Sequence, residues 1–445
     1  MIHYSKILLL NDDGFNDYRG GGITLKNLFQ GWPLDKIAVA HWNDSKPWAH
    51  IATNYYKLGY LESHFIFPLN YISSEPKGNL NGHYTPNNHI VVNSEEKLEL
   101  GIKRELTSNF FKRIFLRIIS TSGLSEIVHP LKTSPQFIHW VKEFNPDIIY
   151  CQCGDLGFIN IVLQTQKVTN ARVVVHIMDD WPSTIYKNKS LGFLLRPLVK
   201  SRFKKILKLA FLRLGISKAM AEEFGKRYHV PFDYFHNPID TARFNEISAN
   251  QRPKDDDFLV VYAGRLGIAS YDSIIEFSKC VEELRKEGTN IRFHIYTELD
   301  SDIITFCQFA QDGTFMLPTL KDSNFREKLC EADLLLYPVD FDAKSIEYIR
   351  LSFPTKLPSY LISGVPVLCY GPPNVHSIQV MEQNDLGFVC AEQDHEKLKR
   401  TLSDAITNDK HRKLYSENAT EFAKNHFERE SVVRSFHQKI NQPNN

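Results

Sequence analysis

The chain has 445 residues, of which 42% are hydrophobic and 12% aromatic, and its 53 lysines and arginines nearly balance 52 aspartates and glutamates. This length and apolar content predict two or three domains with sizeable cores. The balanced charge argues against a nucleic-acid-binding protein, and no apolar run approaches the roughly 18 residues of a membrane-spanning helix, so we expect a cytoplasmic chain.

Short apolar segments of strand character alternate with longer helix-like segments along almost the whole chain. The predicted strands cover residues 6–10, 36–41, 147–153, 172–178, 211–217, 258–264, 291–297, 332–338 and 365–371. Strands that are apolar on both faces and separated by helices form parallel sheets covered on both sides. The sequence therefore predicts an α/β fold with two doubly wound, Rossmann-like domains.

The domain boundary is expected at a polar segment that contains Pro253 and three consecutive aspartates. We predict a first domain over 1–240, a linker over 241–257 and a second domain over 258–425. The remaining residues, 426–445, are expected to form a C-terminal helix that packs back on the first domain. Because ligands bind at the carboxyl ends of the strands in such sheets, a cleft between the two domains is the expected site.

A run of three glycines follows the first predicted strand and precedes a helix predicted over 24–30. Glycine is costly to order, so the run indicates a close approach of the backbone to another group. A glycine loop that opens a helix presents N–H groups to an anion, which makes Gly21 and Gly22 candidate ligand contacts. An ordinary tight turn is the alternative, since neither a P-loop nor a GxGxxG pattern is present.

Two cations in the second domain are candidate phosphate ligands. Gly264 and Arg265 come directly after a predicted strand, where the guanidinium can bind phosphate oxygens in a bidentate manner or form a surface salt bridge. Thr355 is predicted to cap a helix that ends at Gly364. Lys356 would then stand at the helix N-terminus, where a cation opposes the macrodipole unless an anion is bound.

Two adjacent carboxylates, Asp179 and Asp180, follow the fourth predicted strand. They suit a hydroxyl substrate, either as a base or as a hydrogen-bond partner, and helix capping is the alternative. His176, inside the same strand, is interpreted as a core histidine. The pair Asp340 and Asp342 has the spacing of a DxD metal motif, but that pattern is weak, and we expect no metal site.

Together, these domains and the motifs AGRLG (263–267), HNPID (236–240) and SGVPVLCYG (363–371) resemble the GT-B glycosyltransferases, most of all family 4. In that family the first domain binds the acceptor and the second binds a nucleotide diphosphate sugar. The resemblance implies a hexosyltransferase that retains anomeric configuration and needs neither a cofactor nor a metal ion.

The resemblance also implies roles for the candidate residues. Arg265 and Lys356 would bind the diphosphate, with Gly264, Thr355 and Tyr360 beside them. The glycine run, Gly21 and Gly22 included, would approach the transferred sugar. The acceptor hydroxyl would lie near Asp179 and Asp180.

One departure from the family leaves two alternatives open. Family members commonly carry two glutamates eight residues apart, and the corresponding positions here are Leu351 and Ser359. A nucleotide-sugar epimerase of the same fold and a noncatalytic nucleotide-sugar-binding protein therefore remain as alternative functions. Turnover of the donor with and without an acceptor would separate them.

Two segments combine basic and apolar residues. Residues 187–213 contain nine basic residues and no acidic one, and the segment 110–119 is similar, with Lys112, Arg113 and Arg117. Basic helices with apolar faces lie at anionic membrane surfaces, which predicts peripheral association with the inner face of the cell membrane and a lipid-linked or envelope polysaccharide acceptor. The alternative is a pair of amphipathic helices that pack on the sheet and leave their charges in solvent.

Overall fold

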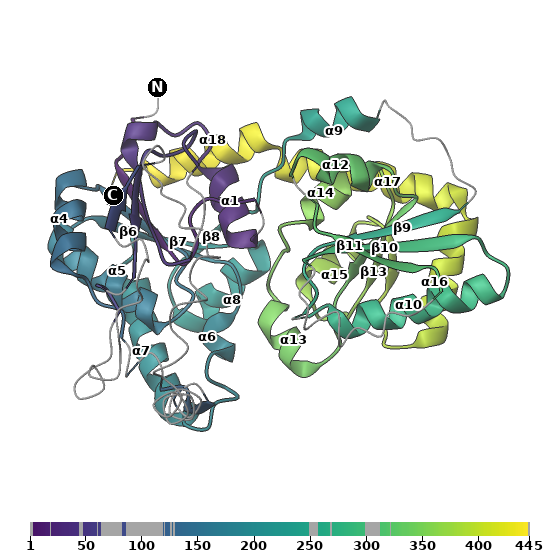
Figure 1. Ribbon diagram of the computed structural model, residues 1–445, viewed down its shortest axis with the longest axis horizontal. Coiled ribbons are helices and arrows are strands. Elements are labelled where there is room, and N and C mark those ends of the chain that lie inside the picture. Colours follow the sequence, from purple (N-terminus) through teal and green to yellow (C-terminus); the bar gives the residue numbers. More distant parts are fainter. Residues whose placement is uncertain are drawn as a thin grey trace, which may run out of the picture. The chain divides into compact units, whose positions relative to one another are not determined.

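The computed structural model describes residues 3–443 apart from 18, 44–47, 60, 64–81, 86–118, 120, 125–126, 128–129, 249–256, 268, 299–311 and 321. Two compact units, here unit 1 and unit 2, divide the chain (Figure 1). Unit 1 comprises Met1–Asn16, Phe29–Tyr234 and His437–Asn445, and unit 2 comprises Asp17–Leu28 and Phe235–Phe436.

Unit 1 is built on an eight-stranded sheet in the order β4-β3-β2-β1-β5-β6-β7-β8, in which β4 alone runs antiparallel to its neighbour. Its central strands are buried along their length, as expected for strands covered on both faces. The strands are β1 (Ile7–Asn11), β2 (Ile37–His41), β3 (Asn54–Lys57), β4 (Gly82–Tyr84), β5 (Ile148–Cys151), β6 (Arg172–Ile177), β7 (Leu212–Gly215) and β8 (Asp233–Tyr234).

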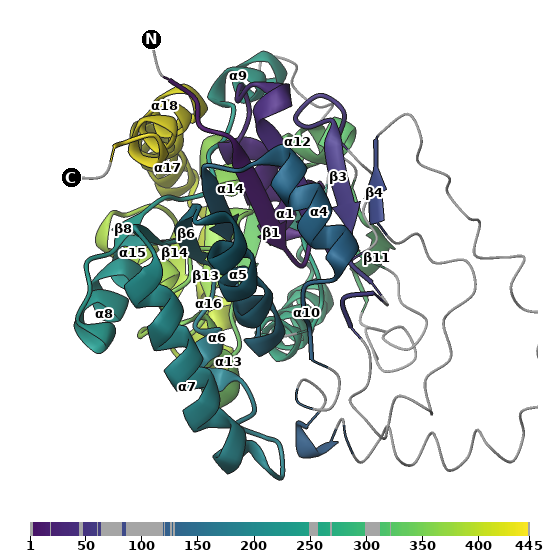
Figure 2. The ribbon, with the colours of Figure 1, turned by 90° about the vertical axis from the view of Figure 1, so that its left-hand side faces the viewer.

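The helices α4, α5 and α7 lie side by side on one face of this sheet (Figure 2). Side chains of Ser134, Asp155 and Ser217 accept hydrogen bonds from backbone N–H groups and so cap α4, α5 and α8 at their first turns. The named helices of unit 1 are α4 (Pro135–Phe144), α5 (Leu156–Thr169), α6 (Trp181–Thr184), α7 (Gly192–Leu209) and α8 (Lys218–Tyr228), with a 3₁₀ turn at Leu34–Lys36.

Unit 2 is built on a six-stranded, all-parallel sheet in the order β11-β10-β9-β12-β13-β14. Two separate hydrophobic clusters contain alternate residues of the same strands, which places one core on each face. The strands are β9 (Phe258–Ala263), β10 (Ile291–Thr297), β11 (Thr314–Pro318), β12 (Leu334–Pro338), β13 (Val367–Tyr370) and β14 (Phe388–Cys390).

The helices of unit 2 cover both faces of the sheet (Figure 1). They are α1 (Gly20–Leu28), α9 (Thr241–Ser248), α10 (Tyr271–Lys286), α12 (Asp322–Cys330), α13 (Ala343–Ile349), α14 (Leu357–Ile362), α15 (His376–Gln383), α16 (His395–Thr407) and α17 (Asp409–Phe427), and α18 (Arg429–Ile440) continues the chain from unit 2 into unit 1. Within the described parts of the chain, no helix combines the length and the hydropathy needed to cross a bilayer.

The predicted α/β class with two parallel sheets is confirmed, and all nine predicted strands are present with small differences at their ends. Two segments differ from expectation. Residues 241–248, expected in a linker, form α9, because Phe244 is buried in a core of unit 2. The glycines, expected in a loop, form the first turn of α1. Residues 110–118 lie outside the described part of the chain.

The C-terminal residues of the chain belong to unit 1. The side chain of Asn441 accepts a hydrogen bond from the N–H of Ser5 at 2.8 Å, and Arg172 donates to the carbonyl oxygen of Gln442 at 2.6 Å. Unit 1 therefore includes the two ends of the described chain.

Candidate functional site

Gly264, Arg265 and Lys356, here the basic corner, come together where β9 ends in unit 2. The hydroxyl of Tyr360, in α14, accepts a hydrogen bond from the N–H of Ala263 at 2.8 Å and donates to the Ala263 carbonyl oxygen at 3.2 Å. Both backbone groups of the last β9 residue are thus tied to α14. This clamp places the residue that precedes α14, Lys356, beside the end of the strand.

The ammonium group of Lys356 lies over the ring of Tyr262, with Nζ 3.9 Å from the ring centroid. Such a cation–π contact holds the charge without neutralising it. The hydroxyl of Tyr262 donates to the carbonyl oxygen of Arg265 at 2.7 Å, so the same side chain also fixes the turn after β9. A Cβ atom at Gly264 would lie 2.7 Å from Nζ of Lys356, and only glycine leaves room for the ammonium group there.

Both cations of the basic corner are available to an anion. Arg265 is exposed and Lys356 is half-buried, and neither forms an ion pair with any residue that the structure describes. A phosphate group in this corner would meet two positive charges that no described carboxylate neutralises. Charge-assisted hydrogen bonds of this kind are among the stronger polar contacts in proteins.

The first turn of α1 packs against the residue before Lys356. A Cβ atom at Gly20 would lie 2.9 Å from Oγ1 of Thr355, so the glycine permits a close approach rather than an unusual backbone conformation. The amide of Asn27, also in α1, donates to Oδ1 of Asn237 at 2.9 Å, and Asn237 donates in turn to the carbonyl oxygen of Thr355 at 3.1 Å. The glycine turn is therefore fixed close to the basic corner.

Two sequence-predicted roles change with this geometry. Lys356 itself occupies the N-cap position of α14, without a capping side-chain bond, so Thr355 does not cap the helix. Tyr360 is fully buried and contacts the site only through Ala263, which makes it a positioning residue rather than a ligand contact. Burial raises the pKa of its hydroxyl well above the ordinary value. Gly22 is also buried, whereas Gly21 is half-buried.

The carboxylates after β6 in unit 1 have different surroundings. Asp180 is 2% exposed and accepts a hydrogen bond from Nη1 of Arg227 at 2.8 Å. Arg227 also donates to Ser183 at 2.7 Å and to Glu223 at 2.9 Å. Burial alone would lower the pKa of Arg227, but the hydrogen bond and the charge of Asp180 outweigh it and raise that pKa.

Asp179, the neighbour of that ion pair, is half-buried. Its catalytic role and that of Asp180 stay predictions. His176 is fully buried, with Nδ1 2.6 Å from the hydroxyl of Tyr150, which agrees with its interpretation as a core histidine.

The DxD residues of unit 2 support backbone turns. Asp340 is buried and accepts from the N–H of Ser273 at 2.8 Å, and burial raises the pKa of its carboxyl group. Asp342 caps α13 by accepting from the N–H groups of Lys344 and Ser345, both at 3.0 Å. Within the described residues, no group of three or more histidine, cysteine or acidic side chains is placed to hold a metal ion.

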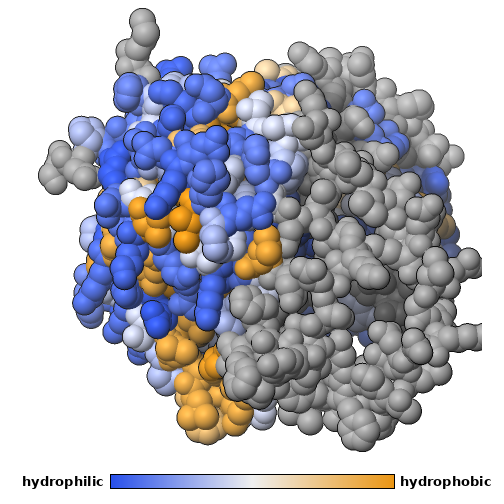
Figure 3. Space-filling view, turned by 60° about the vertical axis from the view of Figure 1, so that its left-hand side comes forward, coloured by the Kyte–Doolittle hydropathy of each residue, from blue (hydrophilic) through white to orange (hydrophobic). Residues whose placement is uncertain are grey.

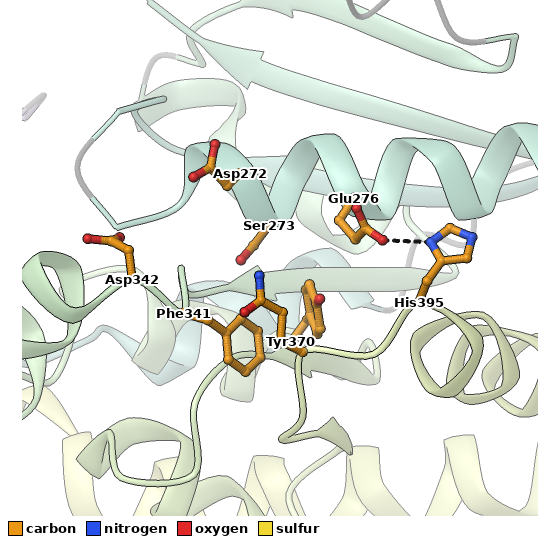
Figure 4. A pocket seen from close by; sticks show the side chains of 8 residues that line it. Asp272, Ser273, Glu276, Phe341, Asp342, Tyr370 and His395 are labelled. Atoms are coloured by element: carbon orange, nitrogen blue, oxygen red, sulfur yellow. Dashed lines mark hydrogen bonds and ion pairs between the residues drawn. The ribbon is translucent and has the colours of Figure 1, made fainter.

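A cavity of about 330 Å³, here the acidic cavity, lies at the carboxyl edge of the unit 2 sheet (Figure 4). Its walls come from the start of α10, the β12–α13 loop, the end of β13 and the segment before α16, and its lining residues are Asp272, Ser273, Glu276, Phe341, Asp342, Tyr370, Gln393 and His395. The lining carries three carboxylates and neither lysine nor arginine among the described residues. The acidic cavity is therefore unsuited to a polyanion, in contrast to the basic corner.

No family model matches the sequence, and no curated protein matches it. Solved structures do match over nearly the whole chain. Sucrose-phosphate synthase from Thermosynechococcus elongatus has a TM-score of 0.64 at 13% identity, with 98% of this chain and 98% of that chain covered. Anabaena HepE, solved in complex with UDP and glucose, has a TM-score of 0.61 at 12% identity, with 99% and 100% covered. A glycosyltransferase from Rickettsia africae has a TM-score of 0.60 at 10% identity, with 98% and 97% covered.

Near-complete coverage of both chains and the two parallel sheets decide the architecture. The chain has the GT-B fold. In this GT-B chain the basic corner lies in unit 2, the half in which the resemblance places the nucleotide sugar. Sequence reasoning missed Asn27 and Asn237, which connect α1 to the basic corner. Asn237 could have been named as a candidate, because it belongs to the HNPID motif. Its hydrogen bond with Asn27 could not be predicted from the sequence.

Proposed function

We propose that the protein is a glycosyltransferase that transfers a sugar from a nucleotide diphosphate sugar to a hydroxyl acceptor. The basic corner is the observation that carries this proposal, because it sets two unneutralised cations and a close glycine at the end of β9. The GT-B fold supports it, as does the nucleotide ligand of the structurally similar HepE. A diphosphate is the group that this arrangement of charge fits.

The chemistry assigned to the basic corner is stabilisation of the leaving group. When the bond between the sugar and the diphosphate breaks, negative charge grows on the departing phosphate oxygen. In this proposal Lys356 and Arg265 bind that oxygen, which is supported by the ring of Tyr262 that holds Lys356 in place. Preorganised charge of this kind lowers the barrier without requiring a metal ion.

For the acceptor side we propose Asp179 as the hydrogen-bond partner or base of the attacking hydroxyl. Asp180 is the weaker candidate, because Arg227 binds its carboxylate and its side chain is only 3% exposed. In this proposal the transferred sugar is a hexose, its anomeric configuration is retained, and the acceptor is a lipid-linked or envelope polysaccharide intermediate. The reaction passes through an oxocarbenium-like state.

The experiment is thermal unfolding of the full chain with UDP, GDP, dTDP and CMP, repeated for Lys356→Met. Methionine keeps the aliphatic length over Tyr262 and removes the charge. A nucleotide at about 100 times its dissociation constant stabilises the folded state by about 2.7 kcal/mol, which raises Tm by several degrees. Loss of one charge-assisted contact costs about 1.5–3 kcal/mol, so we expect Lys356→Met to bind roughly tenfold to a hundredfold more weakly.

Two control variants make this test specific. Lys424→Met removes an exposed charge from α17, and Asp272→Asn changes the acidic cavity on the same sheet edge. Both are expected to keep wild-type nucleotide affinity. Equal affinity in wild type and Lys356→Met, or an equal loss in Asp272→Asn, would contradict the assignment of the basic corner.

Turnover separates the transferase from its two alternatives. A transferase consumes the donor faster when an acceptor is present, an epimerase converts the donor alone, and a binding protein shows a nucleotide-dependent Tm without turnover. The third outcome is favoured by one feature, since Leu351 and Ser359 stand where family 4 enzymes commonly carry glutamates.

A further inference from the structure

The helix α7 in unit 1 has two faces of different character. Its inner face packs on the core, where the side chains of Leu195, Val199, Phe203, Ile206 and Leu207 are no more than 2% exposed. These residues follow helical spacing, as expected for a helix that covers a sheet. The predicted amphipathic helix is thus present, and the alternative of a helix packed on the sheet accounts for this inner face.

Packing on the sheet does not account for the start of the same helix. Phe193 is 69% exposed, Leu194 is 58% exposed and Leu198 is 37% exposed. We name these three residues the α7 tip. Figure 3 shows apolar residues gathered at the lower end of the described surface, and Figure 1 places the first turns of α7 at that end. Neighbouring exposed aromatic and aliphatic side chains of this kind mark interaction surfaces.

Cations follow the α7 tip along the outer face of the helix. The helix carries six exposed basic residues and no acidic residue, and these are Arg196, Lys200, Arg202, Lys204, Lys205 and Lys208. None of the six forms an ion pair with a residue that the structure describes. An overall charge of +1 makes this strip a strong local asymmetry.

We propose that α7 docks this protein on an anionic lipid surface, with the α7 tip inserted among the acyl chains and the cationic strip against the headgroups. A bilayer interface offers both halves of this pattern at once, an apolar layer for Phe193 and Leu194 and a sheet of negative charge beside it. Association is peripheral, because α7 is amphipathic along its length. The inference does not depend on the transferase reaction, since lipid binding needs neither donor nor acceptor.

Charge decides between a lipid surface and the other possible occupants. In a symmetric dimer through this surface, the basic strip of one copy would face that of the other, and like charges would oppose the contact. Nucleic acid would match the charge, but single-stranded nucleic acids are usually bound through stacking aromatic residues, whereas this surface presents mainly leucines. An anionic bilayer can bury the exposed apolar side chains in its acyl layer and pair the cations with its headgroups.

The test is cosedimentation of the full chain with two kinds of vesicle. One kind contains only neutral phosphatidylcholine, and in the other about one third of the lipid is anionic phosphatidylglycerol. We expect binding to the anionic vesicles and little to the neutral ones. Raising the salt concentration should weaken binding, because the exposed charges are screened. Each cation near an anionic surface contributes about fivefold to the partition constant, so Lys204→Ser with Lys205→Ser should lower it about 25-fold.

A second variant removes the apolar half of the surface. Phe193→Ser with Leu194→Ser should abolish measurable binding to the same vesicles, although the charge is unchanged. The matched controls lie on α17, where Leu414, Lys410 and Lys424 are also exposed. Leu414→Ser, and Lys410→Ser with Lys424→Ser, should bind vesicles as the wild type does. All substituted side chains are exposed, and far-ultraviolet circular dichroism checks that each variant is folded.

Three outcomes would overturn the proposal. If the wild-type protein does not cosediment with anionic vesicles, lipid docking is excluded without the need for any variant. Binding that survives both double substitutions assigns the lipid contact to another part of the chain. Sedimentation velocity that shows a dimer lost on Phe193→Ser with Leu194→Ser, with no lipid binding, assigns the surface to a second copy. A nucleotide titration and a transferase assay on the same variants distinguish the two proposals. Loss of lipid binding by α7 should leave nucleotide binding in unit 2 unchanged.

Discussion

The basic corner and the acidic cavity lie on the same carboxyl edge of the unit 2 sheet, yet they have opposite charge. In the basic corner a tyrosine ring and one close glycine position a lysine. The acidic cavity is a hollow of about 330 Å³ with three carboxylates in its lining. The contrast teaches that two regions of one sheet edge can offer a ligand opposite charge. In the proposal above, the diphosphate binds where two cations form no ion pair with a described carboxylate.

The two regions also differ in how their charged groups are held. Lys356 makes contact with an aromatic face and keeps its full charge. At the acidic cavity, Nδ1 of His395 lies 2.7 Å from Glu276 (Figure 4). Its Nε2 atom lies 3.0 Å from Glu283, so this imidazole is already paired with two carboxylates. The first arrangement is poised for a ligand and the second joins α10 to α16.

The largest effect is expected from Tyr360→Phe, which removes the hydroxyl that clamps α14 to β9. The N–H of Ala263 would lose its hydrogen-bond acceptor, at a cost of about 1–3 kcal/mol in the free energy of unfolding. Because Lys356 loses its anchorage, nucleotide diphosphate binding should weaken as well. Urea unfolding and a nucleotide titration measure the two effects.

Tyr337→Phe is the matched control for this prediction. Its buried hydroxyl lies 2.7 Å from Oγ of Ser377, so a similar loss of stability is expected. Nucleotide affinity should not change, because the Tyr337 hydroxyl bonds to Ser377 in α15 and not to the end of β9. Equal nucleotide affinity in both variants would show that Tyr360 stabilises the unit without positioning Lys356.

A smaller and more selective effect is expected from Gly264→Ala. The added methyl group would lie 2.7 Å from Nζ of Lys356, the free end of a flexible side chain, and 3.0 Å from the hydroxyl oxygen of Tyr262, which would have to shift slightly. We therefore expect a loss of stability of about 1 kcal/mol, and nucleotide binding should fall because the ammonium group is displaced. Gly225→Ala, inside α8 of unit 1, should leave binding intact and can be measured in the same titration. Unchanged binding in Gly264→Ala would remove the close glycine from the site.

The smallest effect is a pH dependence that belongs to the acidic cavity. Burial alone would lower the pKa of His395, but its hydrogen bonds with Glu283 and Glu276 outweigh it and raise that pKa above the ordinary 6.5. A raised pKa gives stability that is fully present below pH 6.5 and is lost as the pH rises through the folded-state pKa. For a partly exposed group this amounts to less than about 1 kcal/mol.

The comparison with His395→Gln isolates that contribution. The difference in unfolding free energy between wild type and variant should be largest near pH 6 and should shrink toward alkaline pH. Lys399, which also binds Glu283, and the buried Cys280 face the same imidazole and are unchanged in the variant. A difference that grows with pH would mean that the neutral imidazole is the stabilising form.

Strand positions were predictable from the sequence because the central strands of both sheets are continuous apolar runs. Five strands were not predicted, and these are β3, β4, β8, β11 and β14. Four of them have two to four residues, and no residue of β11 is fully buried, so none gives a long apolar run. The glycine run was expected in a loop because glycine is a poor helix former. It forms a helical turn in the structure, where Gly20 lies close to Thr355, and the sequence does not reveal such a tertiary contact.

The basic corner was predictable in part. Lys356 and Arg265 follow recognisable segments of the sequence, and the structure brings Lys356 beside Gly264. The supporting residues were not predictable in their roles. Tyr360 was expected to touch a ligand, but a hydroxyl that satisfies both backbone groups of one residue is a feature that only the packed structure reveals.

The placement of α1 affects how this protein could be recombined with others. Unit 2 is not one continuous stretch of chain, because Asp17–Leu28 is counted with Phe235–Phe436. A chimera joined at residue 235 would take Asn27 from one parent and Asn237 from the other. The residues of α1 that pack near Thr355 would therefore be replaced together with the first half of the chain. If the basic corner binds the nucleotide as proposed, nucleotide preference in a hybrid chain would depend on both halves. An exchange that aims to transfer that preference would have to include the short segment 17–28 as well.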